Sequence, residues 1–164
     1  MQINVAFYED KVKISEKSEK YKSLQAEKIE RLKIIQTEVE AELCPVDRTN
    51  LIKESNNNIS KFQKYITILS DERVALAKMK TMKDHYEGEL NDFYRFHWDK
   101  STKMTESSIN KYVAAHAIIT SLTNLIRVQE AIVEYYVDVV RNFGNRNFTI
   151  KNIIEASKLE LGLT

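Results

Sequence analysis

The stretch Ile109–Phe143, INKYVAAHAIITSLTNLIRVQEAIVEYYVDVVRNF, decides the fold of this 164-residue chain. More than half of its residues are apolar, and around a helical wheel they point in several directions. A helix that is apolar nearly all round has to be covered on several sides. As a helix it would be about 50 Å long, which is more than a chain of this size easily covers alone. The sequence therefore predicts self-association.

The composition favours an all-α fold. The chain contains Gly 3 and Pro 1, which leaves little material for tight turns or β-hairpins, and 30% of its residues are charged. We expect long helices in a helical hairpin or bundle that assembles as a homo-oligomer. Cys44 is the single cysteine, which excludes an intramolecular disulfide and suits a reducing cytoplasm. No segment reads as a secretory signal or a membrane span, so the sequence predicts a soluble intracellular protein without a membrane partner.

Two helices are expected before the aromatic-rich middle of the chain. Residues 6–43 have the pattern of a charged helix that Pro45 ends, and both a docked or frayed helix and a coiled coil fit its imperfect heptads. The second helix should run from about residue 50 to residue 86, capped by Asp47 or Thr49 and closed by Gly88. The asparagine triplet 56–58 could mark a break in it.

Residues 89–105 lack a helical period and predict a connection, either a loop or a short strand. Thr105 or Ser107 then caps the apolar helix, which Gly144 should end. A turn at 145–147 and a short helix capped by Thr149 should follow. The predicted division is 1–45 for an N-terminal charged helix or extension, 46–105 for a DNA-binding region, and 106–164 for a C-terminal oligomerisation region.

Signatures of catalysis are missing. There is no glycine-rich phosphate loop, and the histidines are not spaced as a helical metal pair with a glutamate between them. We therefore expect neither an enzyme nor a bound cofactor or metal.

The middle of the chain concentrates positive charge that the net charge of +1 hides. The run RVALAKMKTMK at 73–83 holds four bases and no acid, and aromatic residues follow it. Single-stranded nucleic acid binding needs cations for the phosphates and flat side chains on which bases stack. The candidate residues for this are Arg73, Lys78, Lys80, Lys83, Tyr86, Trp98, Lys100 and Lys103. The spacing alone fits equally well a solvated helix face beside aromatics that fill the core.

Four segments carry a resemblance to a known family: VDRTNLIKESNNN (46–58), DERVALAKMKTMKDHYEG (71–88), WDKSTKMTESS (98–108) and VRNFGNRNFTIKNIIEASKLELG (140–162). In order and spacing they resemble the UvsY recombination-mediator family of T-even-type bacteriophages. The resemblance covers about residues 46–164, and no function is carried onto the first 35 or so.

The resemblance implies a non-enzymatic protein that binds single-stranded DNA as a ring-like homo-oligomer. It implies that the protein helps to load a RecA-like (UvsX-type) recombinase onto DNA covered by single-strand-binding protein, in the cytoplasm of an infected bacterial host cell. Family DNA binding carries over to Lys80. Met82 stands where the family segment has a second base, and Lys83 lies about 100° further around a helix.

Family assembly carries over to the C-terminal region. The candidate assembly residues are Phe148, Ile150, Ile153 and Ile154, together with Ile132, Tyr136, Val140 and Phe143 of the apolar helix. Two other interpretations stay open. One is a helical scaffold or adaptor that acts only through protein–protein contacts, and the other is a coiled-coil adaptor that works through residues 6–43.

Overall fold

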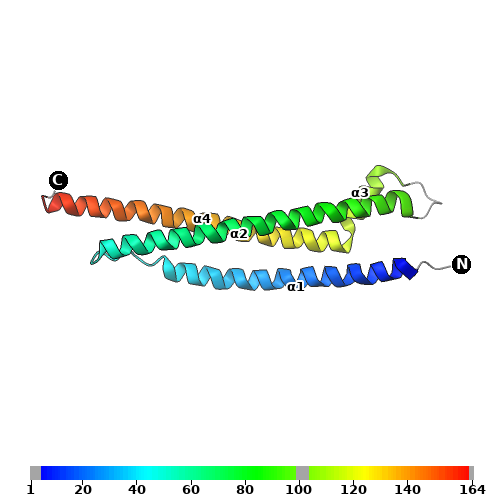
Figure 1. Ribbon diagram of the computed structural model, residues 1–164, viewed down its shortest axis with the longest axis horizontal. Coiled ribbons are helices and arrows are strands. Elements are labelled where there is room, and N and C mark those ends of the chain that lie inside the picture. Colours follow the sequence, from blue (N-terminus) through cyan, green and yellow to red (C-terminus); the bar gives the residue numbers. More distant parts are fainter. Residues whose placement is uncertain (1–4, 99–103, 163–164) are drawn as a thin grey trace. The chain divides into compact units, whose positions relative to one another are not determined.

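The computed structural model describes residues 5–98 and 104–162, with the side chains of residues 5–14 and 97 excepted. It confirms the all-α prediction, and no strand occurs among the residues it describes. Figure 1 shows the helices in chain order. They are α1 (Val5–Glu42), α2 (Leu51–Asp92), the π-helix η1 (Phe93–His97), α3 (Glu106–Ala115) and α4 (Ala117–Glu160).

The long helices contribute to two compact units. Unit 1 comprises Met1–Glu30 and Ala75–Glu130, and unit 2 comprises Arg31–Val74 and Ala131–Thr164. Within each unit α2 runs opposite to α1 and α4, because α1 and α4 pass from unit 1 into unit 2 and α2 passes the other way.

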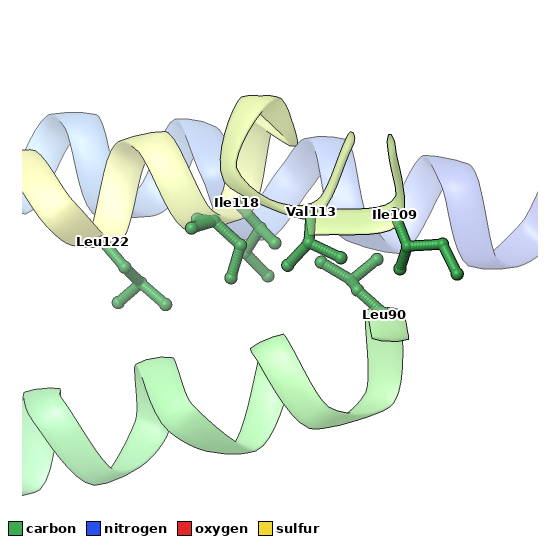
Figure 2. Packing of buried hydrophobic residues seen from close by; sticks show 6 residues of the cluster. Leu90, Ile109, Val113, Ile118 and Leu122 are labelled. Carbon is green, nitrogen blue, oxygen red and sulfur yellow. The ribbon is translucent and has the colours of Figure 1, made fainter. Parts of the chain in front are cut away.

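The core of unit 1 forms where α3 folds back against the end of α2. Figure 2 shows Ile109 and Val113 of α3 beside Leu90 of α2, with Ile118 and Leu122 of α4 next to them. These side chains are buried, and Leu122 is fully so. Partly buried residues pack around this cluster: Tyr21, Met82, Tyr86, Tyr94 and Met104.

The core of unit 2 forms between α2 and α4. Tyr65 stacks on Phe143 with ring centroids 5.2 Å apart. The buried side-chain amide of Asn58 donates a 3.0 Å hydrogen bond to the carbonyl oxygen of Phe143. Arg146 donates to the carboxylate of Glu54 and to the backbone oxygen of Cys44, so one guanidinium joins α4, α2 and the connection between α1 and α2.

The first predicted helix is confirmed almost to the residue, since α1 spans Val5–Glu42 and ends shortly before Pro45. The second is longer than predicted. Asn50, rather than Asp47 or Thr49, accepts a hydrogen bond from the Lys53 backbone N–H at 3.0 Å and so caps α2. The asparagine triplet does not break the helix, because the hydrogen bond of Asn58 to α4 anchors it.

Gly88 does not end α2, and the prediction that it would was wrong. The helix continues to Asp92, because burial of Leu90 in the core of unit 1 outweighs the weak helix preference of glycine. The expected connection is therefore shorter than 89–105 and begins with the π-helix Phe93–His97. Thr105 caps α3 as predicted, since its hydroxyl accepts a hydrogen bond from the Ser108 backbone N–H.

The predicted apolar helix is two helices, separated at His116. The backbone there is extended, and the His116 ring Nδ1 accepts from the Ile118 backbone N–H at 3.4 Å, which starts α4. Burial lowers the pKa of His116, which keeps the ring neutral and Nδ1 able to accept.

Gly144 does not end α4, so the predicted turn at 145–147 and the separate final helix were wrong. Phe143 and Ile150 lie two turns apart on one face, and both are fully buried. The helix must stay intact between them for this face to remain continuous. Thr149 therefore caps nothing, and its hydroxyl donates to the Asn145 carbonyl within the helix.

Alanine at either helical glycine should stabilise the protein. A Cβ at Gly88 meets nothing within 4 Å, and one at Gly144 meets the Phe62 ring at an ordinary 3.7 Å. Gly88→Ala and Gly144→Ala should each raise the free energy of unfolding by about 0.5–1 kcal/mol, measured by urea denaturation. The control is Gly162→Ala, where φ is +67° and no gain is expected. A loss at Gly88 or Gly144 would contradict a helical backbone there.

Candidate nucleic-acid interface

The predicted basic segment lies on α2, but its cations do not share one face. Arg73 falls in unit 2 and is exposed. In unit 1, Lys80 and Lys83 lie about 60° apart around the helix, whereas Lys78 points almost oppositely to Lys80. Lys78 and Lys80 thus lie on opposite sides of the face of α2 that packs against the core. We define Lys78, Lys80 and Lys83 as the basic segment.

Two of the three lysines have acidic partners. Lys80 Nζ lies 2.7 Å from a carboxylate oxygen of Glu130 on α4, and Lys83 Nζ lies 3.1 Å from Glu87 one turn away. Lys78 is exposed and forms no ion pair among the described residues. Ion pairs at the protein surface contribute only about 0.2–1 kcal/mol. A phosphate can therefore replace either glutamate at little cost.

Tyr86 is partly covered in this structure. It packs against the core of unit 1, and Lys17 Nζ of α1 lies 5.2 Å from the centroid of its ring. Next to Lys17 on α1, the hydroxyl of Ser18 lies 2.7 Å from that of Ser121 on α4. The predicted stacking role of Tyr86 stays a prediction, and in this structure a lysine occupies one approach to the ring.

An aromatic cluster surrounds η1. Tyr94 lies 5.4 Å from Trp98 and 5.7 Å from Tyr112 of α3, and Phe93 lies 6.0 Å from Trp98, all between ring centroids. Trp98 is exposed and also donates its backbone N–H to the Phe93 carbonyl. Burial raises the pKa of Tyr94, so its hydroxyl stays neutral.

Two exposed aromatics were not among the predicted site residues. Phe96 is 66% exposed and Tyr112 is 51% exposed. Because α3 packs against the end of α2, Tyr112 joins the cluster around η1 although it is distant in sequence. Phe96 could have been selected from the aromatic run at 93–98, but nothing in the sequence links Tyr112 to it. Lys100 and Lys103, which were predicted to bind DNA, lie outside the described residues.

The predicted assembly residues divide by burial. Ile132, Tyr136, Phe143 and Ile150 are buried in the core of unit 2. Val140, Ile153 and Ile154 are partly buried, and Phe148 is 67% exposed. The first four therefore cover α4 within the chain itself. Any role in assembly therefore falls to the more accessible residues, which are Val140, Phe148, Ile153 and Ile154.

Neither a metal centre nor a membrane span is found in the described part of the chain. No group of three or more His, Cys, Asp or Glu side chains within residues 5–98 and 104–162 could hold a metal ion. Across the same residues, no helix is long and apolar enough to cross a bilayer.

Unit 1 thus contains both residue types on which single-stranded nucleic acid binding depends, lysines on α2 and aromatic side chains around η1. Residues 38–163 match the protein family described as recombination, repair and ssDNA binding protein UvsY. The chain belongs to the UvsY family of recombination, repair and single-stranded-DNA-binding proteins.

Solved structures agree with this assignment at the level of the fold. Two crystal structures of the recombination mediator protein UvsY of bacteriophage T4, in lattice types IV and II, match with a TM-score of 0.67 and 16% identity. Each match covers 79% of this chain, and 98% and 96% of the respective UvsY chains. A comparison with curated proteins gives no significant match.

Releasing Lys80 from its acidic partner should strengthen DNA binding. We expect Glu130→Gln to raise the affinity for a single-stranded oligonucleotide at low salt by up to about fivefold, the equivalent of an exposed ion pair. Fluorescence anisotropy measures it. Glu134→Gln is the control, because Glu134 is exposed on the same helix and pairs with no base among the described residues. Equal effects of the two variants would show that Lys80 does not contact the strand.

Proposed function

We propose that the protein is a recombination mediator that loads a RecA-like recombinase onto single-stranded DNA covered by single-strand-binding protein. We propose further that it acts as a ring-like homo-oligomer. The observation that carries the proposal is the family match over residues 38–163, supported by the fold shared with the T4 mediator. The proposed functional division keeps DNA binding in residues 46–105 and assembly in residues 106–164.

The physical basis is the wrapping of a strand across several copies of the basic segment. One subunit presents few cations, so its own affinity for a strand is weak. Several linked sites on one assembly can bind about 10²–10⁴ times more tightly than one site. Phosphate contacts release counterions, so this affinity must fall steeply with salt. DNA held in this way is presented to the recombinase while the hold of the competing binding protein is weakened.

A specific observation favours the runner-up, a helical scaffold that binds only protein. Lys80 and Lys83 are both paired with glutamates, as in an ordinary solvated helix face. Both functions predict an oligomer. They differ in whether neutralising the basic segment abolishes binding to single-stranded DNA.

The double variant Lys80→Ala/Lys83→Ala tests DNA binding and loading together. We expect its affinity for single-stranded DNA to fall at least tenfold at low salt while light scattering shows an unchanged assembly. With purified RecA-like recombinase on DNA covered by single-strand-binding protein, the lag before ATP hydrolysis should shorten with the unsubstituted protein and not with the variant.

The matched control is Lys22→Ala/Lys33→Ala, which removes the same charge at two exposed positions of α1, outside residues 46–105. If both double variants bind DNA equally well, the basic segment has no role in binding. If the unsubstituted protein leaves the recombinase unaffected, the loading function is wrong.

Assembly requires surfaces that the chain does not bury itself, and two candidates lie among the described residues of unit 2. On α2, Ile52, Ile59 and Ile66 are exposed at intervals of one heptad, about 110° around the helix from the face that packs on α4. On α4, Phe148 and Leu159 are exposed on the side opposite its buried face. We call these the α2 surface and the α4 surface.

The α2 surface has the composition of an interface centre. Asn56 and Gln63 lie beside its isoleucines on the same side of the helix, whereas the charged residues of this stretch point away from it: Lys53, Glu54, Lys61 and Lys64. Depletion of charge distinguishes the centre of an interface from ordinary surface. Two different surfaces on one unit allow head-to-tail contacts, in which the α4 surface of one copy meets the α2 surface of the next. Such contacts generate rings when the rotation closes.

Mixing two variants tests the head-to-tail arrangement. Ile59→Glu/Ile66→Glu should destroy the α2 surface, and Phe148→Glu/Leu159→Glu the α4 surface, so each variant alone should be a monomer. An equimolar mixture should form a dimer and nothing larger, because one intact contact remains between the two variants. Native mass spectrometry distinguishes these species. A full ring from either variant alone, or monomers only in the mixture, would contradict the arrangement.

A further inference from the structure

The part of α1 before residue 38 lies outside the family match, yet in unit 1 specific contacts attach it to helices that the match covers. Ser18 and Ser121 are both buried, with their hydroxyl oxygens 2.7 Å apart, and Ser18 also donates to the Ala117 carbonyl at 3.3 Å. Small side chains at this point let the backbones of α1 and α4 approach closely.

The same stretch of α1 also contacts the basic region of α2. The Tyr21 hydroxyl donates to Met82 Sδ at 3.0 Å, and Tyr21 and Met82 both pack against the core of unit 1. Burial, and after it the neighbouring Tyr86, raises the pKa of Tyr21 to about 12, so this hydroxyl remains a donor at any physiological pH. Met82 therefore lies beneath α1 and cannot serve as a DNA contact.

Lys17 lies next to these contacts and brings a cation to the surface of α2. Its Nζ is held 5.2 Å from the centroid of the Tyr86 ring, a cation–π contact that restricts an otherwise flexible side chain. Lys17 is exposed and forms no ion pair within the described residues, whereas Lys80 and Lys83 each have a glutamate. Tyr86 follows Lys83 by three residues, so the two side chains start about 5–6 Å apart on the same side of α2.

We propose that α1 forms part of the single-stranded-DNA interface, with Lys17 contacting a phosphate next to the basic segment. This inference rests on the proposed DNA-binding role of that segment. Lys17 already lies over the Tyr86 ring in the structure without DNA, and no carboxylate among the described side chains has to be displaced from it. Lys17 supplies a positive charge close to Met82, which stands where the family segment has a second base.

Salt titration of DNA binding tests the inference. Anisotropy of a fluorescent oligo-dT, measured from low to moderate salt, gives the slope of log affinity against log salt concentration. Lys17→Ala should reduce the magnitude of this slope by about 0.7 for each subunit that contacts the strand, the value for one lost phosphate contact on a single strand. Lys17→Arg, which keeps the charge and the ring contact, should retain the slope of the unsubstituted protein.

Lys22→Ala is the matched control. It removes the same charge from an exposed position of the same helix, where Lys22 already pairs with Glu19 at 2.6 Å. Equal slopes for Lys17→Ala and Lys22→Ala would overturn the inference. Tighter binding by Lys17→Ala would also overturn it, because Lys17 would then cover the Tyr86 ring against an incoming base. The absence of DNA binding by the unsubstituted protein would instead refute the proposed function itself.

Discussion

Burial of the apolar side chains of α4 by other helices of the same chain is the constraint on which the structure depends. In unit 1, Leu122 is covered within the cluster that α2 and α3 complete. In unit 2, Phe143 is stacked on Tyr65 and is fully buried. Two features of the fold follow from this burial. The break at His116 lets α3 fold back onto the core of unit 1. The continuous helix through Gly144 keeps Ile150 on the buried face of α4.

The sequence predicts the long helices well, because their apolar periodicity and low glycine and proline content are local properties. Residues 6–43 were expected and Val5–Glu42 is observed, and the cap at Thr105 is confirmed. The prediction that helices end at Gly88 and Gly144 was wrong because of tertiary packing. Neither Gly88 nor Gly144 adopts positive φ, since Leu90 and Ile150 beyond them are held in cores that no local signal announces.

The candidate site was only partly accessible to sequence reasoning. The concentration of lysines on α2 is visible in the sequence, but the pairing of Lys80 with Glu130 joins residues fifty positions apart and requires the packing of α2 on α4. The approach of Tyr112 to Tyr94 likewise depends on α3 folding back. In the same way, the sequence of an apolar helix predicts that its side chains are buried. It does not distinguish burial by other helices of the same chain from burial by a second subunit. Ile132 and Tyr136 proved to be covered internally.

The pair Ser18–Ser121 has a consequence for the alignment of α1. A buried hydroxyl without a partner costs about 1–3 kcal/mol, whereas apolar helix faces slide past one another with little change in contact. Shifting α1 by one turn, about 5.4 Å, would move Ser18 from Ser121 to the level of Leu125, which offers no hydrogen bond. This pair of small polar side chains thus sets the register of α1 against α4. It sets the level of the neighbouring Lys17 along α4, and the hydrogen bond from Tyr21 to Met82 sets its level along α2. Together these contacts determine the spacing between Lys17 and the lysines of α2.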